Sequence, residues 1–376
     1  MRLVADSGLW RIGPAVAAVP LVAVLEVDGA VLAWTVDESA TASGVQITLT
    51  DPGRADWLWR VLGEDGHHAL AAATTEPPDH DAGVDLSGFE VRSGAVDGLR
   101  RLAVGHWLRR WWPASVRDGI VGLDPALLDA EIALLTADAE DFVADDGLDA
   151  DIGALLAPHA GALAMHLLVG DPRVVALVRN AVRLAEEVGV DAPGWAELSD
   201  AVENVRQLPA AARQDDYALA AGGDTGPAPP GLIARGTASI AWSGVPAGVF
   251  DAAEDTVSWA VAADGDAVTA TLHTAVIGPG SPAAIPVALR CGEITAVGEL
   301  DASGRTSIPV LDTANAPLTA TGGWDQDWSA SVVTVGAAVA ESGDARERVR
   351  RFARQRLAQP GSDAFLAETL AAESDY

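Results

Sequence analysis

The chain has 376 residues, with 24 arginines, no lysine and 54 acidic residues, for a formal net charge of −30. The absence of lysine excludes Schiff-base chemistry, a lysine nucleophile and a phosphate-binding loop of the Walker A type. Because so negative a surface repels nucleic-acid phosphates and anionic membranes, the charge disfavours nucleic acid and membrane as partners. A hydrophobic content of 49% nevertheless predicts folded domains.

Residues 1–95 predict a small β-rich domain. Two apolar runs, 21–27 and 30–36, are separated by Asp28-Gly29, which is a strong signal for a β-hairpin. Residues 45–49 alternate between apolar and polar side chains, as a half-buried strand does.

A second hairpin is expected further along this domain. Its strands would be residues 57–62 and 69–74, on either side of the glycine-containing segment 63–66. A polar loop is expected from 74 to 88.

Residues 96–221 predict a helical domain, folded as a bundle. Asp124-Pro125 and Asp171-Pro172 each pair an N-capping side chain with a first-turn proline. The expected helices cover residues 97–112, 124–144, 158–169, 171–188 and 195–208.

Residues 222–231, rich in glycine and proline, predict a linker. Beyond it, residues 232–340 are expected to form an immunoglobulin-like or prealbumin-like β-sandwich. The expected strands are 237–242, 256–262, 267–277, 286–291, 294–300, 305–310 and 328–335. Residues 341–376 should form amphipathic C-terminal helices at 341–358 and 363–372, which makes the fold class α+β and multidomain.

Cys291, the one cysteine of the chain, lies in an apolar stretch and is expected to be a buried structural thiol. The first residues do not resemble a signal peptide, and no window of about 18 uncharged apolar residues is expected to span a membrane. Abundant alanine, scarce asparagine and missing lysine are typical of a GC-rich bacterial genome. We therefore expect a bacterial, cytoplasmic protein.

Two helices carry the basic charge, and they are the candidate partner-binding surfaces. Arginine and aromatic side chains are enriched at interaction hot spots. The candidate residues are Arg100, Arg101, Trp107, Arg109, Arg110 and Trp111 in the first helix, and Arg346, Arg350 and Arg354 in the second. The alternative is structural: a central helix whose arginines pair with local acids, and a terminal helix docked on its own acidic body.

The histidines supply a second hypothesis, a metal-dependent hydrolase. His67, His68 and His80 have carboxylates nearby, and imidazole with carboxylate suits Zn²⁺. Exposed loop residues are the alternative interpretation. Two further histidines, His159 and His166, share one helical face, whereas His106 has no recognisable partner in the sequence.

The sequence contains no recognisable catalytic motif. The acidic segment 145–151 fails as an EF-hand, because Ala150 replaces the glycine at its sixth position. We expect no cofactor, no metal and no catalytic residue. The favoured function is a non-catalytic adaptor or regulatory subunit of a bacterial cytoplasmic assembly. Its expected partner is another protein that presents an acidic or arginine-complementary surface. The remaining alternative is a small-ligand or nucleotide sensor with arginines of the first basic helix at its pocket.

Overall fold

The computed structural model describes residues 1–38, 44–75, 83–86, 88–143, 147–205 and 231–374. The chain divides into two compact units. The first unit comprises Met1–Arg109, Leu123–Asp215 and Gln355–Tyr376, and the second comprises Arg110–Gly122 and Asp216–Arg354. Helices and antiparallel sheets both occur, with a sheet near the N-terminus and further sheets toward the C-terminus, so the fold is α+β.

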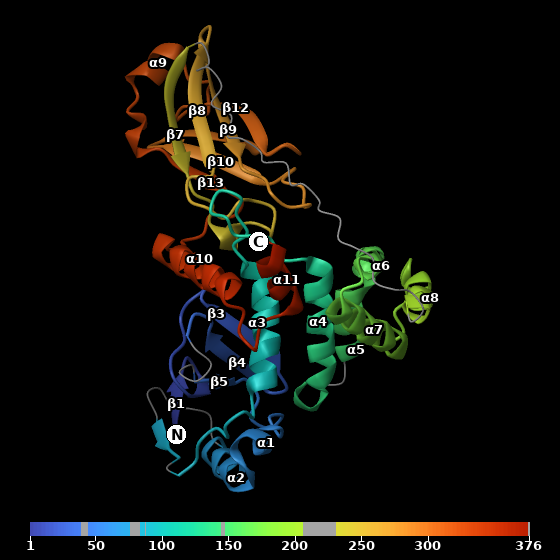
Figure 1. Cartoon of the computed structure of the whole chain (residues 1–376). Coiled ribbons are helices and arrows are strands. Elements are labelled where there is room, and N and C mark those ends of the chain that lie inside the picture. The colour runs from blue at the N-terminus through green and yellow to red at the C-terminus, as the bar shows by residue number, and fades with distance from the viewer. Residues whose placement is uncertain (39–43, 76–82, 87, 144–146, 206–230, 375–376) are drawn as a thin grey trace. The chain divides into compact units, whose positions relative to one another are not determined.

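The first unit holds an antiparallel sheet of six strands in the order β3-β4-β5-β2-β1-β6 (blue in Figure 1). Its strands are β1 (Arg2–Asp6), β2 (Leu9–Ile12), β3 (Val22–Val27), β4 (Ala30–Thr35), β5 (Gln46–Leu49) and β6 (Gly83–Asp85). The β3–β4 hairpin confirms the prediction from Asp28-Gly29. Gly29 has φ +70°, and a Cβ atom there would lie 2.3 Å from the carbonyl oxygen of Asp51, so glycine is required.

The second predicted hairpin of this region is wrong. Two short helices stand in its place, α1 (Leu58–Leu62) and α2 (Glu64–Ala73). Gly63 joins them with φ +82°, and the alanine-rich end of α2 favours a helix over a strand. Part of the expected polar loop is strand β6, which pairs with β1.

The expected helices of the middle segment are present, and their ends differ by a few residues. They are α3 (Asp97–Trp111), α4 (Pro125–Asp138), α6 (Ala160–Val169), α7 (Pro172–Glu187) and α8 (Trp195–Val205). Both Asp-Pro signals act as predicted. The Asp124 carboxylate accepts a hydrogen bond from the Ala126 amide at 2.9 Å, and the Asp171 carboxylate accepts one from the Arg173 amide at 2.8 Å.

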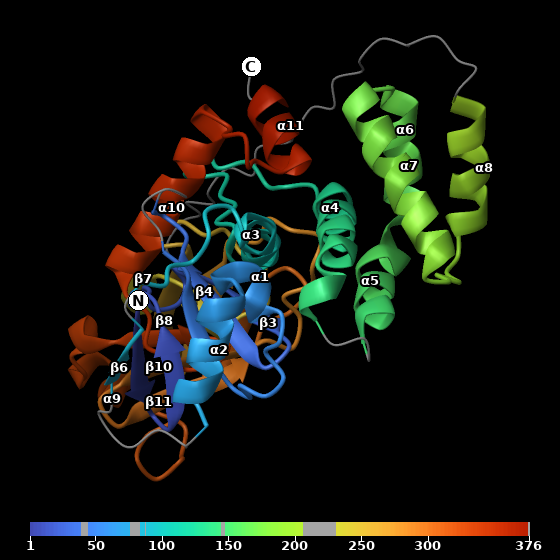
Figure 2. The same cartoon turned by 90° about the horizontal axis from the view of Figure 1, so that it is seen from below.

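The chain between α4 and α6 contains elements that the sequence did not predict. The helix expected to reach residue 144 ends earlier and is followed by the 3₁₀ turn η1 (Glu140–Phe142). Helix α5 (Leu148–Leu156) begins inside the acidic segment, and η2 (Ala157–His159) joins it to α6. Figure 2 shows α3 between the sheet and α4, with α5 and α7 beyond α4.

One helical stretch among the described residues, Leu148–Val169, is long and apolar enough to cross a membrane by length and composition. The expectation that no stretch of the chain is long and apolar enough to span a membrane is therefore wrong. About a third of its most apolar window, 33%, is buried. Core helices of other proteins can be equally long and apolar, so this stretch is only weak evidence for a membrane span.

The second unit contains two antiparallel sheets. The four-stranded sheet, in the order β12-β9-β8-β7, consists of β7 (Leu232–Ala238), β8 (Val257–Asp264), β9 (Ala267–Thr274) and β12 (Arg305–Pro309). The three-stranded sheet, β11-β10-β13, consists of β10 (Pro286–Cys291), β11 (Ile294–Glu299) and β13 (Val332–Val335). Buried residues of both sheets form one hydrophobic core.

Most predicted strands of this unit are present, with two corrections. The strand expected at residues 237–242 is β7, which ends at Ala238 before the 3₁₀ turn η3 (Trp242–Gly244). The strand expected at 328–335 starts as the 3₁₀ turn η4 (Trp328–Ala330), and α9 (Ala320–Asp325) precedes it. Cys291 is 1% exposed, as predicted, and its thiol donates to the Asp327 carbonyl at 2.9 Å.

Two helices lie at the C-terminal end of the chain. They are α10 (Gly343–Ala358), whose residues from Gln355 onward belong to the first unit, and α11 (Leu366–Ser374). Within the first unit, Arg356 holds the fully buried Glu368 through two hydrogen bonds, and the Leu366 amide donates to Glu131 at 2.8 Å. The first contact joins α11 to the end of α10, and the second joins it to α4.

Candidate ligand-binding site

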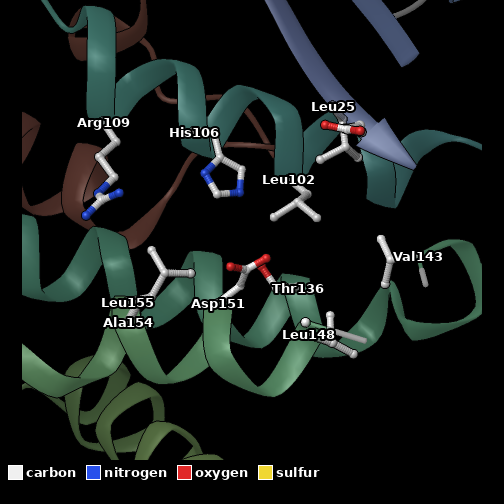
Figure 3. A pocket seen from close by; sticks show the side chains of 12 residues that line it. Leu25, Leu102, His106, Arg109, Thr136, Val143, Leu148, Asp151, Ala154 and Leu155 are labelled. Atoms are coloured by element: carbon white, nitrogen blue, oxygen red, sulfur yellow. The ribbon is translucent and has the colours of Figure 1, made fainter. Parts of the chain in front are cut away.

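A cavity of about 390 Å³ lies in the first unit (Figure 3). Its walls come from α3, α4, α5 and β3, together with Val143 after η1 and Gly147 before α5. Apolar walls come from Leu25, Leu102, Val143, Leu148, Ala154 and Leu155, and polar groups from Glu26, His106, Arg109, Thr136 and Asp151. A cavity of this size with a few convergent polar groups suits a small organic molecule.

Helix α3 brings three of these residues to the cavity. Leu102, His106 and Arg109 are spaced i, i+4 and i+7, which places them on one helical face. The helix itself is held against the sheet side by Trp107, which is 3% exposed and whose indole donates to the Pro20 carbonyl at 2.6 Å. The orientation of His106 follows from this anchoring.

A buried carboxylate on α4 orients Arg109. The Nε atom of Arg109 lies 2.9 Å from Oδ1 of Asp129, and Nε2 of His159 lies 2.9 Å from Oδ2 of the same side chain. Asp129 is 3% exposed, so its carboxylate is stabilised by contact with these two side chains and not by water. Within the described residues the terminal nitrogens of Arg109 form no such pair, and its side chain is 52% exposed.

His106 is expected to be neutral at pH 7. Burial lowers the pKa of its imidazole below the usual 6.5, and the positive charge of Arg109 lowers it further, whereas Asp129 and Asp151 act in the opposite direction. A neutral imidazole can donate one hydrogen bond and accept another. It can also take up a proton from a bound molecule.

Asp151 supplies a negative charge to the cavity, opposite in sign to that of Arg109. It lies in the first turn of α5, where the helix dipole favours a carboxylate, and Leu148 and Leu155 on the same helix line the cavity beside it. Figure 3 shows the carboxylate of Asp151 facing the imidazole of His106 across the cavity. The site therefore offers a cation, a neutral acid–base group and carboxylates around an apolar floor.

The predicted partner-binding residues of α3 fall in both units. In the first unit, Arg100 lies 3.7 Å from Asp363, and Arg101 pairs with Glu131 while its guanidinium stacks over Phe365. In the second unit, Arg110 donates to the carbonyls of Trp242 and Val245 at 3.0 and 3.1 Å. Its guanidinium lies 4.2 Å from the ring centroid of Trp111.

The predicted arginines of α10 occupy an ion-pair network in the second unit. Arg346 and Arg350 are 8% and 3% exposed and both contact Glu254. Burial raises the pKa of Glu254, but the hydrogen bonds from Arg346 and Arg350 outweigh that effect and lower the pKa to about 2. Arg354 is more open, with a side chain 43% exposed that pairs with Asp118 at 3.1 Å. Binding of a partner by these residues stays a prediction.

The histidines of the metal hypothesis are not brought together among the described residues. His67 and His68 lie on α2, whereas His80 falls outside the described part of the chain. His159 and His166 pair with different carboxylates, Asp129 and Asp124. Over the described residues, no group of three or more His, Cys, Asp and Glu side chains could hold a metal ion.

The sequence identified Arg109 as a candidate but missed the rest of the cavity. Asp151 was interpreted only as part of a failed calcium loop, and His106 as a histidine without a partner. The spacing of Leu102, His106 and Arg109 on one face of α3 was a usable signal. His106 on α3 and Asp151 on α5 are 45 residues apart, and no signal in the sequence indicated that these two helices pack together.

No protein-family model, curated protein sequence or solved structure matches this chain.

Proposed function

We propose that the protein binds a small zwitterionic molecule, of the amino-acid type, in the cavity of its first unit. The observation that carries this proposal is the arrangement of opposite charges within one cavity of about 390 Å³. Arg109 offers terminal donors, which pair with no carboxylate in the described part of the chain, for a ligand carboxylate at one side. Asp151 and Glu26 offer acceptors for an ammonium group. The leucine side chains between them suit an aliphatic portion.

Binding of this kind supports a sensor or regulatory role. The neutral His106 gives the site a group whose protonation a bound ligand can change, since its pKa depends on burial and on nearby charges. Of the functions considered from sequence, this corresponds to the small-ligand sensor with an α3 arginine at its pocket. An adaptor role through the exposed Arg354 stays a separate prediction, as does a cytoplasmic location.

The finer fold description is part of the same proposal. Two antiparallel sheets around one core support an immunoglobulin-like or prealbumin-like sandwich in the second unit. The mutual contacts of α4, α5, α6, α7 and α8 support a helical bundle in the first.

The test is a thermal-shift and calorimetric screen of the full chain with the twenty standard amino acids. At least one should raise the melting temperature, because a ligand present at 100 times its Kd stabilises by about 2.7 kcal/mol. Asp151→Asn should abolish the shift. Asp149→Asn is the matched control, because Asp149 lies in the same first turn of α5 but does not line the cavity.

A second pair of variants separates the cavity histidine from general effects. His106→Gln should weaken the shift, whereas His68→Gln, at an exposed position on α2, should leave it unchanged. The proposal is overturned if no amino acid shifts the melting temperature, or if Asp149→Asn loses as much binding as Asp151→Asn.

A further inference from the structure

The outer face of the four-stranded sheet in the second unit, which we call the β7–β12 face, carries a second set of convergent polar groups (Figure 1 shows the four strands side by side). The strand register places eight outward side chains in two rows. One row is Thr237, Ser258, His273 and Arg305, and the other is Arg235, Ala260, Thr271 and Ser307. The alternate residues, such as Trp259 and Leu272, are buried in the core.

The charge on this face is opposite to that of the surrounding chain. Residues 227–340 contain three arginines, one histidine and 11 acids. Two of the arginines, Arg235 and Arg305, and the histidine lie on the β7–β12 face, whereas none of the eight outward residues is acidic. In so acidic a protein, a face with two guanidinium groups and no carboxylate among its eight outward side chains attracts anions.

The carboxylates near its edges already accept hydrogen bonds from neighbouring groups. Asp301 accepts the amides of Ser303 and Arg305 at 2.8 and 3.0 Å, and these hydrogen bonds lower its pKa. Asp255 accepts the Thr237 hydroxyl at 3.1 Å. Asp301 also lies near Arg305, so an anion must share that guanidinium with it.

The face is hollowed. An open depression of about 850 Å³ covers it, bounded by the basic residues Arg235, His273 and Arg305 and, beside Arg305, by Asp301. Ala260, on an inner strand, has the smallest of the eight side chains, and its neighbours across the strands are Arg235 and Thr271. A short side chain between longer ones makes room for a ligand to lie against the sheet.

The side chains around the depression define the ligand chemistry. Guanidinium groups bind phosphate through charge-assisted hydrogen bonds, and the hydroxyls of Ser258, Thr271 and Ser307 can exchange hydrogen bonds with a polyhydroxyl compound. None of the eight outward residues is a large apolar or aromatic anchor, which a peptide partner would need. The two arginines stand on the two edge strands and in different rows. Three strand spacings across the sheet and two residues along it separate them by roughly 16 Å on the diagonal.

From this arrangement we propose that the β7–β12 face binds a sugar that carries a phosphate group at each end. Arg235 and Arg305 hold the two phosphates, and the hydroxyl side chains between them contact the sugar. This site is independent of the cavity in the first unit.

Calorimetric titration of the full chain tests this, with fructose 1,6-bisphosphate, fructose 6-phosphate, fructose and inorganic phosphate as probes. The bisphosphate should bind tightest. Arg235→Gln and Arg305→Gln should each weaken it at least about tenfold, to the level of the monophosphate, because each removes one charge-assisted contact. Ala260→Glu should abolish binding while both arginines remain.

Arg290→Gln is the matched control. Arg290 is the third arginine of this segment, exposed on β10 in the other sheet, so its loss changes the net charge equally without touching the face. Unchanged bisphosphate affinity in this variant supports the proposal. Equal weakening by Arg290→Gln, no binding by the wild type, or inorganic phosphate binding as tightly as the bisphosphate overturns it.

Discussion

Asp124 performs two tasks at the start of α4. One carboxylate oxygen caps the helix by accepting two backbone amides, and the other lies 2.8 Å from Nε2 of His166 on α6. The hydrogen bond to Asp124 raises the pKa of His166 above 6.5. Burial raises the pKa of Asp124, but the hydrogen bonds from His166 and from the backbone amides outweigh that effect, so the pKa lies below 3.8.

This pair predicts a pH dependence of stability. A raised folded-state pKa means that the contribution of His166 is fully present below pH 6.5 and is lost as the pH rises through the folded value. Asp124 contributes above its ordinary pKa of 3.8 and loses that contribution as the pH falls through its lowered value. His166→Gln should therefore cost more stability at pH 6 than at pH 9.

Melting temperatures of wild type and variant at both pH values measure this difference. His68→Gln, at an exposed position on α2 outside the Asp124–His166 pair, is the control for the loss of a histidine. An equal loss at pH 6 and pH 9 for His166→Gln would mean that the ion pair does not contribute to folding.

At the scale of the elements, the sequence predicted best where a short local signal decides the structure. The Asp28-Gly29 turn and the two Asp-Pro caps each act within four residues, and all three were found as predicted. The 57–74 segment was mispredicted because its glycines were taken as a hairpin turn, although its alanine-rich end and first-turn acids favour a helix. The cavity could not be predicted because it depends on packing between distant helices.

The contact between α3 and the residues before α11 depends on the absence of a side chain at Gly105. A Cβ atom there would lie 2.8 Å from ring atom Cζ of the buried Phe365 and 2.8 Å from Cγ1 of Ile132. Helix propensity alone favours alanine over glycine by about 1 kcal/mol. Overpacking a well-packed core costs about 1–3 kcal/mol, so the clash should outweigh the gain in propensity.

We therefore expect Gly105→Ala to lower the free energy of unfolding, by up to about 2 kcal/mol. Gly98→Ala is the control in the same helix, because a Cβ atom at Gly98 meets nothing within 4 Å. That variant should be neutral or slightly stabilising. Urea denaturation of both variants tests the prediction, and a stabilised Gly105→Ala would show that Phe365 can move aside.

At the scale of the whole molecule, many of the described arginines form ion pairs within their own units. Arg346 and Arg350 with Glu254, and Arg356 with Glu368, are examples with buried members. Even if each of the 24 arginines neutralised one acid, 30 acidic charges would remain. The folded chain therefore carries a large unbalanced repulsion, which destabilises a compact state.

Screening should relieve that repulsion. The Debye length falls from about 30 Å at 0.01 M salt to about 8 Å at 0.15 M, so repulsion between exposed acids weakens, whereas partly buried pairs such as Arg346–Glu254 are screened less. We expect the melting temperature to rise by several degrees over this range, since 1 kcal/mol corresponds to about 2–4 °C for domains of this size. Sodium chloride and choline chloride should act alike if screening is the cause, whereas a rise with sodium alone would indicate bound cations. A fall in melting temperature with both salts would show instead that the ion pairs contribute more to stability than the net charge of −30 removes.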